Sequence, residues 1–126
     1  VADISGADAA APAGGVGLTV DVSSEDDVKR MVDETVSAYG KLDVLVNNAA
    51  IVPFTAWDDI DFAEWRRIMA VNLDGTFYCT HAVLPSMRTR KDGLVINISS
   101  WAGKYTAAMA GAAARVAMTR LRVVSR

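Results

Sequence analysis

The chain has 126 residues, of which 52% are hydrophobic and 22% are charged, and its formal net charge at pH 7 is -2. This length predicts a single domain, residues 1–126, with enough apolar residues for a sizeable core. The apolar content and weak charge favour neither a disordered chain nor nucleic acid as a partner.

Strand and helix patterns alternate along the chain, which is typical of doubly wound α/β folds. Strands are predicted at residues 1–4, 16–20, 42–46 and 94–98, and helices within 5–17 and at 24–40, 61–87 and 107–123. Ser24 with Asp27 fits a capping box at one helix start, and Gly40 fits the end of that helix. Asp61 and Glu64 fit the start of the long helix that follows.

The run from Leu42 to Ala50 is the most informative stretch of the sequence. A short, strongly apolar strand is typical of a parallel sheet buried on both faces, and it ends here in two asparagines and two alanines. Ligands bind at this end of such strands. Alanines allow a flat cofactor to approach the backbone, and amide side chains can tie neighbouring strands together. The alternative is that Asn47 and Asn48 simply begin a loop.

The small number of cysteine and histidine residues limits the possibilities for a disulfide or a metal site. One cysteine, Cys79, and one histidine cannot form an internal disulfide or a metal-ligand cluster, so no metal is expected. Cys79 fits a small buried helix residue. No apolar run is long enough to cross a membrane, and with the unpaired cysteine we expect a cytoplasmic protein.

The run ending at Ala50 resembles the Asn-Asn-Ala-Gly motif of the short-chain dehydrogenase/reductase family, with Ala50 in place of the glycine. Other parts of the family pattern follow in order: Val-Asn-Leu around Asn72, then a strand that ends at Ser99 and Ser100. The resemblance implies an α/β fold, an incomplete Rossmann-like doubly wound parallel sheet. The first strand with its Gly-rich turn and the C-terminal strands are missing, so we expect an interior piece of a longer protein.

The resemblance also implies a cofactor site at the strand ends. Asp3 would accept hydrogen bonds from the adenosine ribose and repel a 2′-phosphate, which favours NAD over NADP. Asp21 and Val22 would lie near the adenine, and Asn48, Ala49 and Ala50 along the cofactor. Asp3 and Asp21 equally fit residues that cap the turns after their strands.

Two catalytic residues are implied by the same resemblance. Ser100 would stabilise charge on the substrate oxygen, whereas Ser99 would cap the following turn. Asn72 would hold a water in the family's proton relay; the alternative is an exposed polar residue on a long helix. The Tyr-x-x-x-Lys pair of the family is absent. In one alignment with the family, the positions of this tyrosine and lysine are taken by Gly111 and Arg115; in another they are taken by Ala113 and Ala117. The nearby Tyr105, beside Lys104, is a poor substitute for the family tyrosine.

These features predict a chain that resembles an NAD(P)-dependent oxidoreductase acting on an alcohol or ketone. We expect this fragment to be inactive by itself. The alternative is a non-catalytic interaction module derived from the same fold. It would form a homo-oligomer through the helix containing Asn72 and the Ala-rich helix from Ala107 to Val123.

Overall fold

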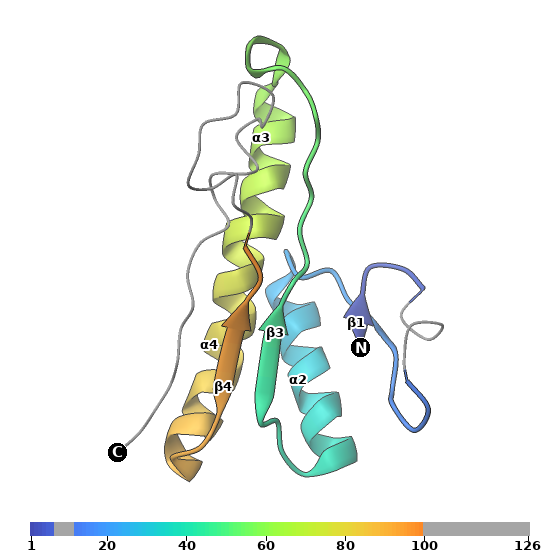
Figure 1. Ribbon diagram of the computed structural model, residues 1–126, viewed down its shortest axis with the longest axis vertical. Helices are drawn as coiled ribbons and strands as arrows, with labels where there is room; N and C mark the ends of the chain where they lie inside the picture. The colour runs from blue at the N-terminus through green and yellow to red at the C-terminus, as the bar shows by residue number, and fades with distance from the viewer. Residues whose placement is uncertain (7–11, 100–126) are drawn as a thin grey trace.

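The computed structural model describes residues 1–6 and 12–99, and these form strands with helices packed on one side (Figure 1). Helices α3 and α4 follow one another in a long column beside β3 and β4, and α2 lies next to them. The strands and α-helices in chain order are β1 (Ala2–Asp3), β2 (Leu18–Thr19), α2 (Glu25–Tyr39), β3 (Val44–Asn47), α3 (Phe62–Met69), α4 (Gly75–Arg90) and β4 (Leu94–Asn97), with a short 3-10 helix at Trp57–Asp59 before α3.

The strands form two separate parallel pairs. Strand β1 pairs with β2 in the register Ala2↔Leu18, and β3 pairs with β4 in the register Val44↔Leu94. Both pairs are parallel, which confirms the predicted strand direction, and β3 is joined to β4 through α3 and α4. The strand predicted at 16–20 is only two residues long, because β2 pairs with a β1 of two residues.

Helix α2 begins and ends where its capping residues predict. The Ser24 hydroxyl accepts a hydrogen bond from the Asp27 N–H (3.3 Å), and Gly40 ends the helix at φ 79°, a left-handed conformation that suits glycine. Four apolar residues recur in its sequence at the spacing of one helix face: Val28, Met31, Val36 and Tyr39. Val28 and Met31 are buried, whereas Val36 and Tyr39 remain 37% and 52% exposed. The second half of the helix therefore has an apolar face with little packed against it.

The long helix predicted from residue 61 is interrupted. The Asp61 side chain accepts hydrogen bonds from the N–H groups of Ala63 (2.8 Å) and Glu64 (2.7 Å), as predicted. Glu64 does not complete the cap, because its carboxylate accepts a hydrogen bond from the Thr55 hydroxyl (2.6 Å). Between α3 and α4 the backbone forms a π-helical turn over Ala70–Asp74. Such turns are frequent at functional sites.

The core lies where α2 and α4 cover the inner faces of the strands. It combines residues from three strand segments and two helices: Val20, Val28, Met31, Leu45, Cys79, Val83, Met87 and Val95. Leu45 and Val95 face each other across the β3–β4 pair and are both buried. Val44 and Val46, on the other face of β3, are 50% and 51% exposed, so the expectation of burial on both faces is wrong for this strand. This core fixes β3 and β4 against α4, which sets the position of the strand ends described next.

Candidate functional site

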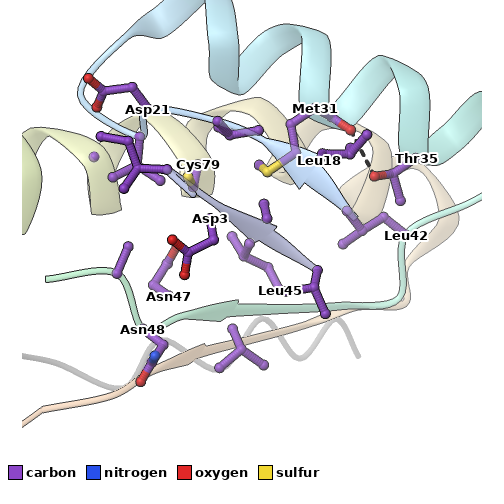
Figure 2. A pocket seen from close by; sticks show the side chains of 18 of the residues that line it. Asp3, Leu18, Asp21, Met31, Thr35, Leu42, Leu45, Asn47, Asn48 and Cys79 are labelled. Atoms are coloured by element: carbon purple, nitrogen blue, oxygen red, sulfur yellow. Dashed lines mark hydrogen bonds between the residues drawn. The ribbon is translucent and has the colours of Figure 1, made fainter. Parts of the chain in front are cut away.

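A cavity of about 950 Å³ lies between β1 and β3 and extends to the carboxyl ends of both strands. Its lining includes the predicted cofactor residues Asp3, Asp21, Val22, Asn48, Ala49 and Ala50. Figure 2 shows Asp3 and Asn47 close together, with Asn48 just beyond. Residues far apart in sequence therefore meet at one edge, as expected where parallel strands end.

Asp3 is exposed at the end of β1. Its Oδ1 accepts a hydrogen bond from the Ser5 N–H (3.1 Å), so this oxygen caps the turn after the strand. A carboxylate has acceptor capacity for more than one partner. The side chain can therefore cap the turn and at the same time accept a hydrogen bond from a hydroxyl group of a ligand.

Asp21 caps the turn that follows β2, as one of its two interpretations from the sequence expects. Its Oδ1 accepts hydrogen bonds from the Ser23 N–H (2.9 Å) and the Ser23 hydroxyl (2.6 Å). Its own N–H donates to Asp27 Oδ2 (3.0 Å). That backbone bond, followed by the bond from the Arg30 guanidinium, lowers the pKa of Asp27. The second oxygen of Asp21 is the one left to meet a ligand.

Val22 is held beside the start of α4 by a close approach that requires glycine. A Cβ added at Gly75 would lie 2.8 Å from Val22 Cγ2 and 3.1 Å from the Val22 carbonyl oxygen. Any side chain at Gly75 would push the segment after β2 away from the helix. The glycine therefore fixes the distance between the Asp21 turn and α4.

Asn47 ties three elements together at the end of β3. Its Nδ2 donates to Asn97 Oδ1 on β4 (2.8 Å) and lies 3.1 Å from the Thr80 hydroxyl of α4. Asn47 and Asn97 are direct partners in the strand register. The predicted tie between neighbouring strands through an amide is confirmed. Thr80 was not anticipated, because only the packing of α4 brings it to the strand end.

Asn72 is 5% exposed, so its interpretation as an exposed helix residue is wrong. Its Oδ1 accepts from the Ile51 N–H (2.9 Å), and its Nδ2 donates to the Ile51 carbonyl (2.9 Å). The side chain lies in the π-helical turn and pairs with Ile51 as a neighbouring strand would. It thereby fixes the loop that follows Asn48, Ala49 and Ala50. Its predicted water-holding role stays a prediction.

Cys79 lines the cavity floor and is 4% exposed, as expected for a small buried helix residue. Burial raises the pKa of the thiol to about 11, which keeps it protonated and unreactive at neutral pH. Among residues 1–6 and 12–99, no three side chains could hold a metal ion together. No helix in this part of the chain is long and apolar enough to cross a membrane.

Several predicted residues lie outside the described part of the chain. They are the predicted catalytic Ser100 and, beyond it, Lys104, Tyr105, Gly111, Ala113, Arg115 and Ala117. The described part therefore contains the predicted cofactor residues and Asn72.

The sequence profile of the short chain dehydrogenase family matches residues 7–122. A subunit of (2S)-[(R)-hydroxy(phenyl)methyl]succinyl-CoA dehydrogenase, BbsD from Thauera aromatica, is 38% identical over 112 residues, which cover 83% of this chain and 44% of the relative. An uncharacterized oxidoreductase of Thermotoga maritima is 42% identical over 83 residues, 66% of this chain and 32% of the relative.

Solved structures agree with these sequence matches. A short-chain dehydrogenase from Streptomyces avermitilis superimposes with a TM-score of 0.78 at 31% identity, covering 87% of this chain and 41% of that one. A metagenomic short-chain oxidoreductase in complex with NADP gives a TM-score of 0.75 at 35% identity, covering 83% of this chain and 49% of that one.

The chain belongs to the short-chain dehydrogenase family. Its fold is a partial Rossmann-like fold with parallel strands, as predicted. It spans between 32% and 44% of the length of the curated relatives it matches. It resembles oxidoreductases over the part that it shares with them.

Proposed function

We propose that this chain carries the adenosine side of an NAD(P)-dependent oxidoreductase site. The observation that carries the proposal is the convergence of Asp3, Asp21 and the segment from Asn48 to Ala50 on one cavity at the strand ends. A nicotinamide cofactor supplies hydride transfer when it is bound. The residues present suit a ribose and an adenine: Asp3 is exposed, and small alanines follow Asn48.

The phosphate side of the cofactor has less support. The family's Gly-rich turn, which supplies backbone N–H donors at a helix N-terminus, is missing from the sequence. We therefore expect the chain alone to bind NADH too weakly for calorimetric detection at micromolar concentrations. Saturable binding in that range would contradict this expectation.

The adenosine site can be tested directly by titrating the chain with millimolar 5′-AMP and following backbone amide shifts. We expect shifts at Asp3, Asp21 and Asn48 and none at Asp92, an exposed acid at the opposite end of β4. Asp3→Asn should weaken binding, and the matched variant Asp92→Asn should not. Shifts scattered over both ends of the strands would overturn the proposed site.

We propose NAD as the preferred cofactor, because the Asp3 carboxylate would repel the 2′-phosphate of NADP. The metagenomic structural neighbour was solved with NADP, which favours the other choice for that protein. A preference for NAD and a preference for NADP predict opposite orders of affinity for 5′-AMP and 2′,5′-ADP. Tighter binding of 5′-AMP, with the preference reduced in Asp3→Ser, supports NAD; tighter binding of 2′,5′-ADP supports NADP.

For the reaction we propose an alcohol or ketone substrate, with Ser100 at the substrate oxygen and no turnover by this chain alone. The missing Tyr-x-x-x-Lys pair removes the general acid, which contributes about 10²–10⁴ in rate. A chimera that supplies the absent N-terminal and C-terminal parts from a related enzyme should also be inactive. Gly111→Tyr with Arg115→Lys, or Ala113→Tyr with Ala117→Lys, should then create activity that Ser100→Ala removes. Turnover by the unmutated chimera, lost in Tyr105→Phe, would contradict this proposal.

A second candidate is a dimerisation module, favoured by exposed apolar side chains along the π-helical turn and α4. Leu73 and Phe77 are 44% and 61% exposed, and they are four residues apart on the same helical face. Phe77 stacks on His81 with ring centroids 5.5 Å apart. We propose that this face pairs with a second copy. A dimer in sedimentation that is lost in Phe77→Glu but kept in Thr89→Glu would support the module.

A further inference from the structure

Helix α2 holds the main chain of Asp21, which lines the cavity just beyond β2. The last hydrogen bond between the β1 and β2 segments is donated by the Val20 N–H to the Asp3 carbonyl (2.9 Å). The next N–H, that of Asp21, donates instead to Oδ2 of Asp27 in the first turn of α2 (3.0 Å). The Asp21 carbonyl accepts a hydrogen bond from the N–H of Ser24, the cap of α2 (3.0 Å). Both main-chain groups of Asp21 are therefore bound by α2 and its cap.

The Asp27 carboxylate has a different partner for each of its oxygens. Oδ2 binds the Asp21 N–H, and Oδ1 accepts from the Arg30 guanidinium (3.0 Å). The same Arg30 nitrogen donates to the Thr19 carbonyl of β2 (3.0 Å). Rotation of the carboxylate would break one of its two bonds, so Arg30 fixes the oxygen that binds Asp21. These bonds, that from Asp21 first, lower the pKa of Asp27 and keep it ionised at neutral pH, the form that accepts both.

The direction of the Asp21 side chain depends on where the turn after β2 lies. Its Oδ1 is bound by the Ser23 N–H and hydroxyl, and both contacts lie within the turn itself. Without Asp27, residues 21–23 could tilt as a unit and still keep both contacts. That tilt would carry the second oxygen of Asp21 away from a ligand in the cavity. The bond to Asp27 is thus the one that sets the direction of the Asp21 carboxylate relative to α2.

We propose, on the basis of the adenosine site proposed above, that Asp27 is a positioning residue for that site. Acting through the Asp21 N–H, it sets where the Asp21 carboxylate meets the adenosine part of the cofactor. Arg30 supports it, because Arg30 holds the Asp27 carboxylate against the end of β2. Neither Asp27 nor Arg30 is among the residues that line the cavity, so each acts on a ligand through Asp21 and its turn.

A first measurement needs no ligand and compares Asp27→Ala with Asp26→Ala. Asp26 is an exposed acid in the same helical turn, so its loss removes the same charge from the start of α2. In Asp27→Ala, hydrogen exchange at the Asp21 amide should quicken by about threefold or more. Residual dipolar couplings of the Asp21 and Ser23 amides should also change, because these amides turn relative to α2. We expect neither change in Asp26→Ala. Unchanged exchange and couplings in Asp27→Ala would overturn the proposal.

A double-mutant cycle with 5′-AMP separates positioning from a general loss of structure. Asp27→Ala should weaken 5′-AMP binding by about three- to tenfold in the wild-type chain. In an Asp21→Ala background the same change should have little further effect, because the carboxylate that Asp27 directs is gone. A merely structural role would weaken binding equally in both backgrounds, and that result would overturn the proposal.

The same cycle distinguishes failure of the positioning role from failure of the adenosine site. Weaker binding in Asp21→Ala with wild-type affinity in Asp27→Ala would overturn the positioning role alone. Wild-type affinity in Asp21→Ala would mean that Asp21 does not meet the ligand, which would overturn both.

Arg30 provides a second and weaker test of the same path. The Arg30 side chain is 45% exposed and the bond from Asp21 to Asp27 remains without it, so Arg30→Ala should weaken 5′-AMP binding by only about twofold. The matched variant Glu34→Gln removes the charge pair on the other side of Arg30 (3.4 Å) and should leave the affinity unchanged. An equal loss in the two variants would contradict the supporting role of Arg30.

Discussion

The two strand pairs are fixed to the molecule to very different degrees. The β3–β4 pair has four residues in each strand, with Leu45 and Val95 buried beneath α4. The β1–β2 pair has two residues in each strand; both residues of β1 are exposed, and neither β2 residue is fully buried. What holds β2 near the core is mainly Val20, 2% exposed, just after the strand.

The two strand pairs also differ in the side-chain hydrogen bonds that join them to the helices. The β3–β4 pair is joined to α4 by Asn47, and Arg90 donates to the Leu42 carbonyl just before β3 (2.7 Å). The β1–β2 pair has a tie of this kind in Arg30, which donates from α2 to the Thr19 carbonyl (3.0 Å), but this arginine is exposed. We therefore expect the adenosine side of the site to open more easily than the side fixed by Asn47 and Asn72.

The largest effect should come from the core beneath β3 and β4. Met87 is fully buried, so Met87→Ala should lower the free energy of unfolding by about 2–5 kcal/mol. Leu18 of β2 is only half-buried, and Leu18→Ala should cost roughly half as much or less. Urea unfolding followed by circular dichroism measures both variants. Equal losses would show that the two strand pairs are equally well fixed.

Much of the fold could be predicted from local sequence signals. The caps at Ser24 and Asp61, the glycine stop at Gly40 and the parallel strand ending at Asn47 all depend on residues close in sequence. The π-helical turn was not predicted. Asn72 lies in this turn and pairs with Ile51, a contact between residues far apart in sequence that local sequence signals do not reveal.

Local sequence signals were also insufficient to predict which side chains are exposed and some of the residues that position the site. Periodicity gave α2 an apolar face that includes Val36 and Tyr39, but it could not show what covers that face, and both remain exposed. For the site, the family resemblance implied that Asp3 and Asn48 would both lie along the cofactor, and both residues line the same cavity. Thr80 and Gly75 were not identified, because their roles arise from the packing of α4.

A smaller effect is expected at Asn72, which connects the well-fixed half to the loop after β3. Asn72→Ala would leave the N–H and C=O of the half-buried Ile51 unpaired, and we expect a loss of about 1–3 kcal/mol. Hydrogen exchange should quicken at the Ile51 amide and stay unchanged at Thr19. Asn72→Asp keeps one acceptor but places a carboxylate oxygen near the Ile51 carbonyl, so it should not rescue stability. Full rescue by Asn72→Asp would contradict the two-bond pairing.

Removing the Asn47 amide should have a still smaller effect, confined to the ends of β3 and β4. Asn47→Ala loses the bonds to Asn97 and Thr80, and the strand ladder remains, so we expect a loss of about 1 kcal/mol. Amide exchange at Ile98, whose N–H donates to the Asn47 carbonyl (2.9 Å), should quicken more than at Leu94 at the start of the strand. An equal change at both amides would mean that the ladder as a whole, rather than its end, depends on Asn47.

The smallest effect at neutral pH should come from Cys79, which lies in the core and also lines the cavity between the two strand pairs. Burial raises its pKa from 9.0 to about 11 in the folded chain. The unfolded thiol therefore ionises first, so the stability contributed by the protonated thiol is fully present below pH 9 and is lost between pH 9 and about 11. Urea midpoints of the wild-type chain and of Cys79→Ala should differ by a constant amount up to pH 8.5 and converge above pH 9. A parallel course of the two curves across that range would show that water reaches Cys79 through the cavity, and that the core is as open there as the β1–β2 pair.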